Sequence, residues 1–451
     1  MKKILIIGTG PSGISVLDKL KKNKNRIDIV DGSTKLYKKK NLNQFNKNLS
    51  PKFGDPEFKI TQKNFVKNYN VQSKKFFISS TLSRGGGTRF WGSGLEVPGK
   101  MYFTRNKLNI SNYKKFYKKT LNFFGYNRSS IYKDLKKEFY NLESTIKQDR
   151  FFFLKKLKLA IKPGTEKNDY NNYLNHSYFN AYDKISNYKE QNIKYINCAV
   201  RDITKKKKFI VTFSNKKRGE YDIIFCCAGN LGSSIIVLNL LKIRKITLKI
   251  FHTPMFLLLF ITLNPFIVVK NLISKFKFPL PCANIIFKSN KGNFRGSIMF
   301  FHNLKLKINN FFLFNFLKYF IIGGNFFLDQ SFSKSYLVKK NKKYKIISRD
   351  INFPNFIKKK IIKFFLKSFC ISIPFLNFGR FMTGSDAHYT SSLYFLNNHK
   401  RIFNFKNELI SKKNFFVLDG SLIPPGLIYP TFFTVVNNFK VMNSIVKKNG
   451  I

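Results

Sequence analysis

The chain has 451 residues, of which 43% are hydrophobic and 17% aromatic, so it can bury a large core and global disorder is not expected. Its formal net charge is +61, but lysine is scattered over nearly the whole chain together with much Asn, Phe and Ile, which indicates compositional drift in an A/T-biased coding sequence. The sequence contains no zinc finger, RNA-binding signature or long basic arm, so we expect no nucleic-acid partner; peripheral contact with an anionic membrane or acidic glycans is the alternative explanation of the charge.

The cysteines and the first apolar run indicate a reducing compartment. The cysteines are Cys198, Cys226, Cys227, Cys282 and Cys370. Their odd number and the lack of a CxxC pair argue against a disulfide framework, and we predict no metal site. The run from Ile4 to Ile7 is too short for a secretory signal and leads directly into glycines. We therefore expect a cytoplasmic protein, with membrane association as the alternative that the charge leaves open.

Residues 3–31 have the pattern of a βαβ unit that binds a dinucleotide. A short apolar strand at residues 3–7 leads into Gly8-Thr9-Gly10-Pro11-Ser12-Gly13, and a second strand ends at Asp31. Between the strands, one apolar helical face is formed by Ile14, Val16, Leu17 and Leu20. The glycines allow a tight turn, backbone approach to a pyrophosphate and close helix packing, and the helix N-terminus faces the phosphate charge. Asp31 is placed to accept hydrogen bonds from the ribose, and the motif's position near the N-terminus favours FAD over NAD.

A second glycine-rich segment runs from Arg84 to Gly94 with the sequence Arg-Gly-Gly-Gly-Thr-Arg-Phe-Trp-Gly-Ser-Gly. Its glycines let backbone amides converge on an anion or a ring without steric cost. It also holds Trp91, the only tryptophan of the chain. Because flexible linkers rarely contain Phe and Trp, we predict a binding loop rather than a flexible surface loop.

A hairpin followed by a buried strand is expected between residues 193 and 227. The expected β segments are 195–197, 209–213 and 221–227. The last of these ends in Ala228-Gly229, before a helix that should begin near Ser233. Small residues at this point can pass close to a cofactor in a nucleotide-binding sheet. Cys226 and Cys227 fit the core better than the role of nucleophile.

Two segments near the C-terminus carry the candidate chemistry. Gly384-Ser385-Asp386-Ala387-His388-Tyr389 is a polar loop in which His388 is a candidate base, although a lone histidine is more often structural. Further on, a strand ends in Asp419-Gly420, and a proline-rich turn with Tyr429 precedes an apolar helix from about Phe433 to Val446. If that strand joins the nucleotide-binding sheet, Asp419 and the helix N-terminus lie near the cofactor.

The middle of the chain is harder to assign. Residues 35–75 are polar, and residues 101–190 carry amphipathic helical stretches such as 130–142. Residues 250–269 are twenty consecutive uncharged positions, which is long enough for a transmembrane span, but they include two prolines and a histidine. We expect buried strands there, with an interfacial membrane patch and a true span as alternatives. The Phe-rich stretch 310–328 has the same ambiguity.

In their order along the chain, these segments resemble the glucose-methanol-choline (GMC) oxidoreductases. The Gly-Gly-Gly-Thr-Arg-Phe-Trp-Gly sequence is most similar to the branch that contains sugar and sugar-acid dehydrogenases. The resemblance implies an α/β fold, in which a Rossmann-type FAD-binding domain with a parallel sheet and helices is interleaved with an α+β substrate domain. The implied FAD-binding domain comprises residues 1–50, 76–100, 188–245 and 376–451. The implied substrate or cap domain comprises residues 101–187 and 246–375.

The family binds FAD, removes the hydroxyl proton of an alcohol or sugar and passes hydride to flavin N5. The resemblance therefore implies an FAD-dependent oxidoreductase acting on CH–OH groups, with a small-molecule substrate and an electron acceptor that stays unassigned. His388 matches the catalytic histidine of the family, and the backbone of Val200 would meet the adenine. The other residues implied to bind FAD are Gly8, Gly10, Ser12, Gly13, Asp31, Gly86, Gly87, Thr88, Trp91, Ala228, Gly229, Asp419, Gly420 and Thr431.

The chain departs from the family pattern at two places. Tyr429 stands where a second His or Asn is usual; it can hydrogen-bond a substrate oxygen but is a poor base at neutral pH. Thr390-Ser391 stand where glycine usually follows the histidine. No histidine occurs in residues 84–98, so FAD is expected to be non-covalent. The alternatives are a non-catalytic or membrane-docked flavin-binding protein and an NAD(P)-linked Rossmann enzyme.

Overall fold

The computed structural model describes residues 1–21, 23–32, 56–89, 94–126, 139–140, 143, 152–156, 158–160, 179–186, 192–265, 268–269, 283–287, 294–300, 318–372, 381–386 and 388–449. The α-helices are α1 (Pro11–Leu20), α3 (Pro56–Tyr69), α4 (Lys100–Arg105), α5 (Ser111–Lys114), α6 (Tyr117–Phe123), α8 (Ala181–Ser186), α9 (Gly229–Leu240), α12 (Asn355–Leu366), α13 (Ser392–Lys400) and α14 (Thr431–Asn449). The strands are β1 (Lys3–Ile7), β2 (Arg26–Asp31), β3 (Val71–Lys74), β4 (Gly94–Leu95), β5 (Phe152–Lys156), β6 (Lys158–Leu159), β7 (Ile193–Asn197), β8 (Val200–Lys205), β9 (Phe209–Phe213), β10 (Arg218–Tyr221), β11 (Ile223–Cys226), β12 (Lys245–Ile250), β13 (Met255–Thr262), β14 (Ala283–Phe287), β15 (Phe294–Phe300), β16 (Ile321–Phe327), β17 (Ser335–Lys340), β18 (Lys343–Ser348), β19 (Cys370–Ser372) and β20 (Phe415–Val417).

A five-stranded parallel sheet joins both ends of the chain. Its strand order is β20-β11-β1-β2-β7, and every neighbouring pair is parallel. The strands β1, β11 and β20 are short and almost wholly apolar, as strands covered on both faces must be, whereas β2 contains two aspartates and the edge strand β7 is only partly buried. The expected α/β fold with a parallel sheet is confirmed, and the strand before Asp419 does join this sheet.

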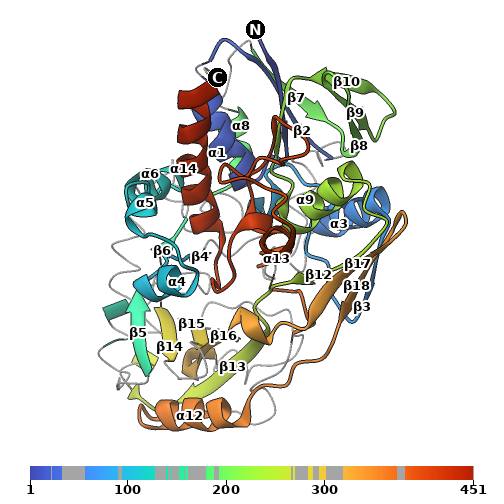
Figure 1. The fold of residues 1–451 in the computed structure, drawn as a ribbon. Coiled ribbons are helices and arrows are strands. Elements are labelled where there is room, and N and C mark those ends of the chain that lie inside the picture. Colours follow the sequence, from blue (N-terminus) through green and yellow to red (C-terminus); the bar gives the residue numbers. More distant parts are fainter. Residues whose placement is uncertain are drawn as a thin grey trace.

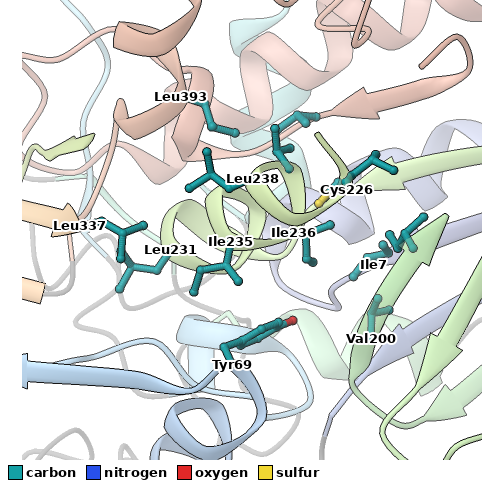
Figure 2. Packing of buried hydrophobic residues seen from close by; sticks show 14 of the residues in the cluster. Ile7, Tyr69, Val200, Cys226, Leu231, Ile235, Ile236, Leu238, Leu337 and Leu393 are labelled. Atoms are coloured by element: carbon teal, nitrogen blue, oxygen red, sulfur yellow. The ribbon is translucent and has the colours of Figure 1, made fainter. Parts of the chain in front are cut away.

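Helices cover both faces of the parallel sheet. Side chains alternate along a strand, so Ile4 and Ile6 of β1 face one layer while Leu5 and Ile7 face the other. The first layer contains α1 and α14, which lie side by side (Figure 1). The second layer is built around α9, with side chains of α3, β17 and α13 packed around it (Figure 2). The apolar helical face predicted at residues 14–20 is buried in the first layer.

The region after β7 is more elaborate than the expected hairpin. The segments β8, β9 and β10 form a three-stranded antiparallel sheet, in which β8 was not anticipated. Its burial alternates weakly at Val200–Lys205, so the hydrophobic pattern gave little signal there. The strand β11 then enters the parallel sheet as predicted.

Two further sheets are formed mainly by the middle of the chain. One has six strands in the order β19-β13-β16-β15-β14-β5, and the other has four in the order β12-β17-β18-β3. The uncharged run 250–269 supplies β13, and the Phe-rich stretch supplies β16, its antiparallel neighbour. The expected strands are therefore confirmed at Met255–Thr262 and Ile321–Phe327. Residues 265, 268 and 269 are helical instead, and Lys318–Phe320 is a 3₁₀ turn. The strand β3 comes from residues that the sequence left unassigned.

None of the described helices is long and apolar enough to cross a membrane. The helical stretch expected at 130–142 lies almost entirely outside the described residues, and the domain boundaries stay a prediction. Cys226 and Cys227 are buried in the core as expected, and burial raises the pKa of the Cys226 thiol to about 12. A thiol of this kind is not a nucleophile at neutral pH.

Candidate functional site

Glycine is required at two positions of the first motif. Gly8 has φ of 107°, its N–H donates to the Val30 carbonyl at 2.7 Å, and a Cβ there would lie 2.3 Å from the Cys227 carbonyl oxygen. A Cβ on Gly13 would lie 1.9 Å from the Gly8 carbonyl oxygen. The turn therefore brings α1 close to β1, as the motif predicts.

The two glycine-rich segments meet face to face. A Cβ on Gly86, whose φ is 57°, would lie 3.1 Å from the Cα of Gly10. Gly10 is the N-cap of α1 and has no side chain to satisfy the first N–H groups of the helix. Gly10 and Ser12 are half-buried and Gly87 is exposed, so this backbone remains accessible. An uncapped helix N-terminus between bare glycine backbones fits a pyrophosphate.

Two more expected contacts border this cradle. Ala228 is half-buried and Gly229 is exposed, with no atom within 4 Å of a Cβ built there. Thr88, in the 3₁₀ turn η2 (Gly86–Arg89), is buried and holds the second segment in place: its hydroxyl donates to the Gly85 carbonyl at 2.6 Å and accepts from the Ala181 N–H at 3.1 Å. Trp91, predicted to bind the cofactor, lies outside the described residues.

Asp31 ends β2 beside the cradle and is already engaged. Its carboxylate accepts hydrogen bonds from the Thr9 hydroxyl, at 2.6 Å, and from the Tyr195 hydroxyl. Thr9 in turn accepts from the Gly85 N–H at 2.8 Å, so Asp31 also fixes the second glycine segment. Arg84 lies over the Tyr195 ring, 4.1 Å from its centroid. A ribose hydroxyl at Asp31 would share the carboxylate with these donors, which the sequence did not reveal.

Asp419 organises the end of β20. Its carboxylate is buried and accepts from the Ser233 hydroxyl, from the Ser421 N–H at 2.9 Å and from the Ser421 hydroxyl at 2.6 Å. Burial raises its pKa above the usual value, against the effect of these hydrogen bonds. Asp419 therefore ties α9 to the 3₁₀ turn η6 (Gly420–Leu422), and its present contacts are all internal.

The remaining predicted contacts lie at element ends. Gly420 is half-buried, Thr431 is the first residue of α14, and Val200 is the buried first residue of β8. The Val200 carbonyl accepts from the Asn68 amide at 3.3 Å. The helix α14 begins at Thr431, two residues before the predicted start near Phe433.

The structure brings the two predicted catalytic residues together. The rings of His388 and Tyr429 are 5.1 Å apart at 80°, and Phe327 of β16 contacts both, at 5.8 and 5.7 Å between ring centroids. Both polar rings are only half-buried. A Cβ on Gly94 would lie 3.1 Å from the Tyr429 ring. The second glycine-rich segment therefore contacts Gly10 through Gly86, near its start, and Tyr429 through Gly94, at its end.

Glu96 sets the position of Tyr429. This buried carboxylate accepts from the N–H groups of Ile428, at 2.7 Å, and Tyr429, at 3.1 Å, and pairs with Arg295 of β15. Arg295 stands directly opposite Phe327 across the sheet, so both side chains lie on the same face. Glu96 was missed because 332 residues separate it from Ile428.

A buried hydrogen-bond network lies behind His388. One oxygen of Asp386 accepts from the Thr253 N–H and the Thr253 hydroxyl, both at 2.9 Å, and from the His388 N–H at 3.3 Å. The Thr253 hydroxyl also lies 3.3 Å from His388 Nδ1. The other Asp386 oxygen is 3.4 Å from Nδ1 of His252, and both of those side chains are almost fully buried.

No protein-family model matches the chain, and no curated protein matches it. Among solved structures, a formate oxidase of Aspergillus oryzae RIB40, studied for the effect of a mutation on FAD modification, is similar with a TM-score of 0.63 and 8% sequence identity. The match covers 100% of this chain and 98% of the other. The chain has the fold of that oxidase.

At 8% identity, this likeness shows the shared fold alone, and the resemblance to the GMC oxidoreductases and to their sugar-oxidising branch stays a prediction. The GMC resemblance located His388 and Tyr429, but not the residues that hold them. Glu96 and Thr253 act through contacts with residues far away in the chain, and neither belongs to a recognisable motif. Asp386 lies in the segment Gly384–Tyr389, and its carboxyl two residues before His388 was the one available signal.

Proposed function

We propose that the chain is an FAD-dependent oxidoreductase that acts on the CH–OH group of an alcohol, a sugar or a sugar derivative. The observation that carries this proposal is the half-buried His388 ring beside Tyr429. Its Nδ1 atom is linked to the Asp386 carboxylate through the Thr253 hydroxyl. The fold shared with that formate oxidase and the glycine cradle support FAD as the cofactor. Gly10, Ser12 and Gly86 would hold its pyrophosphate, without a covalent link to the chain.

The network determines which nitrogen of His388 carries the proton. An ionised Asp386 only accepts hydrogen bonds, so the single hydroxyl proton of Thr253 is donated to it. The Thr253 oxygen then presents a lone pair to His388 Nδ1, which must be the protonated nitrogen. The opposite nitrogen, Nε2, is left as a proton acceptor.

His388 Nε2 is therefore the group that takes the substrate hydroxyl proton. Loss of this proton from the oxygen would favour departure of hydride from the carbon that bears it, and FAD, when bound, would supply the hydride acceptor. The imidazolium formed on His388 is stabilised by Asp386 through Thr253. Tyr429 holds the substrate oxygen near His388, in an orientation set by Glu96. Since Arg295 is paired with Glu96, we expect an uncharged substrate rather than a free acid.

The replacement Thr253→Val should test this role of the network. Valine keeps the size of the side chain but loses the hydroxyl that links Asp386 to His388. We expect the rate of flavin reduction to fall about tenfold, the size of one hydrogen bond. The acid limb of the pH–rate profile should also move to lower pH, because the imidazolium loses the support of the carboxylate. Thr253→Ser, which retains the hydroxyl, should stay near the wild-type rate. A slow Thr253→Ser variant, or a Thr253→Val variant with an unchanged pH–rate profile, would contradict this role.

The replacement Tyr429→Phe should separate binding from chemistry. Phenylalanine keeps the ring contacts with His388 and Phe327, and only the hydroxyl is lost. We expect KM for the substrate to rise about tenfold, with kcat within about threefold of wild type. Steady-state kinetics at neutral pH would measure both. A loss of kcat as large as that of a His388 variant would instead make Tyr429 the base.

A further inference from the structure

The helix α12 lies at the end of the molecule opposite the β8–β10 sheet (Figure 1). Its inner face is apolar and packs on the six-stranded sheet, and Phe365 stacks on Phe260 of β13 with ring centroids 3.9 Å apart. The buried residues of this face are Ile357, Ile361, Phe364 and Phe365. The rest of the helix is therefore presented outward.

The outward face of α12 is strongly basic. Lys358, Lys359, Lys360 and Lys363 are exposed on the helix, and Lys367 is exposed directly after it. The Lys360 amine lies 5.4 Å from the centroid of the Phe287 ring, whereas Lys359, Lys363 and Lys367 follow the side opposite the buried residues. Between Asp350 and Asp386 the sequence contains no acidic residue. The positive charge of this segment is thus not balanced along the chain.

Large apolar side chains are exposed at the end of the same helix. Leu366 is 51% exposed, Phe369 is 64% exposed, and Ile371 on the edge strand β19 is 46% exposed. Leu263, at the end of β13, is 59% exposed, and its N–H donates to the Phe369 carbonyl at 2.8 Å. These four side chains therefore lie together, directly beside the lysines.

Phe369 is held outward by an unfavourable backbone. Its φ is 56°, in the left-handed region that glycine and asparagine normally occupy after a helix. The turn is braced by the Phe369 N–H, which donates to the Leu366 carbonyl at 3.0 Å. Among the described non-glycine residues with positive φ, Phe369 is the one with an apolar side chain.

We propose that these residues form a membrane-binding surface, in which Lys359, Lys363 and Lys367 contact anionic headgroups and Leu263, Leu366, Phe369 and Ile371 enter the interface. Basic residues around exposed aromatic and aliphatic side chains are the combination that peripheral binding to anionic bilayers requires. Compositional drift scatters lysine and phenylalanine over the chain, but it does not predict four exposed apolar side chains gathered beside a basic helix. A soluble acidic polymer would be attracted by the lysines and would leave the apolar side chains without a partner.

The test is cosedimentation of the full chain with phosphatidylcholine vesicles, with and without phosphatidylserine. Wild type should bind only the anionic vesicles, and added salt should weaken the binding. Phe369→Gly, which suits the backbone, should reduce binding at least about tenfold without lowering the unfolding temperature. Replacement of Lys359, Lys363 and Lys367 by Gln should reduce it roughly 100-fold.

Matched controls remove similar groups elsewhere. Phe405→Gly removes a phenylalanine that is 82% exposed on the loop before β20, and a second triple variant replaces Lys206, Lys207 and Lys217 around the β8–β10 sheet by Gln. Both controls should bind vesicles within about threefold of wild type. The proposal is overturned if wild type does not bind anionic vesicles, if salt has no effect, or if the controls lose as much binding as the α12 variants.

Discussion

Replacing His388 with alanine should lower the rate of substrate-dependent flavin reduction by roughly 10²–10⁴-fold, the usual contribution of a general base. The reason is the geometry behind the ring, where Thr253 and Asp386 leave Nε2 as the acceptor of the substrate proton. Flavin binding should be unchanged, because the glycine cradle does not include His388. Rapid-mixing absorbance of the flavin under anaerobic conditions measures the rate, and flavin fluorescence measures binding.

The matched control for this variant is His399→Ala. His399 is an exposed histidine on α13, and its loss should leave the rate within about twofold of wild type, as expected for a surface substitution. A His388→Ala variant that reduces its flavin as fast as wild type would favour the alternative of a flavin-binding protein without this chemistry. An equal loss of rate in the His388→Ala and His399→Ala variants would point to a general disturbance of the folded protein.

Replacing Gly10 with alanine should lower the affinity for FAD at least about tenfold while leaving the protein without flavin as stable as wild type. A Cβ on Gly10 would meet its nearest atoms, in Gly86 and Gly85, only at 3.9 and 4.0 Å, and its φ of −67° suits alanine. The added methyl group would therefore cost nothing in the empty cradle but would stand where the pyrophosphate approaches. Titration with FAD and thermal unfolding of the flavin-free protein measure the two effects.

Replacing Gly13 with alanine should act on the fold instead. The Cβ would lie 1.9 Å from the Gly8 carbonyl oxygen, so α1 must move and the protein should lose about 1–3 kcal/mol of stability or more. Gly99→Ala is the control, because nothing lies within 4 Å of a Cβ built there and its φ is −84°.

For the Gly10→Ala variant, an unchanged affinity for FAD would argue against a dinucleotide in this cradle.

The sequence located the elements whose information is local. The strand β1, the glycine turn and α1 follow from apolar periodicity and from backbone positions that only glycine can occupy. The last strand and α14 were also expected, although periodicity placed the start of the helix at Phe433 instead of Thr431. The GMC resemblance then brought His388 and Tyr429 into one site before any contact between them was known.

The contacts that could not be predicted from the sequence join residues that lie far apart in the chain. Thr253 and Asp386 are 133 residues apart, and Glu96 reaches Tyr429 across 333 residues. The hydrogen bonds of Asp31 depend on Tyr195, whose strand had been expected in a hairpin and lies instead at the edge of the parallel sheet. Each of these contacts is a product of sheet topology, which no local pattern encodes.

The most direct test of the proposed function is an anaerobic titration of the flavin-loaded protein with a panel of sugars and alcohols. The account predicts that at least one uncharged CH–OH donor bleaches the flavin absorbance and is converted to the corresponding carbonyl compound, one molecule per flavin. A protein that binds FAD in the glycine cradle but is reduced by no member of the panel, while a nicotinamide cofactor or a free acid reduces it, would contradict the account.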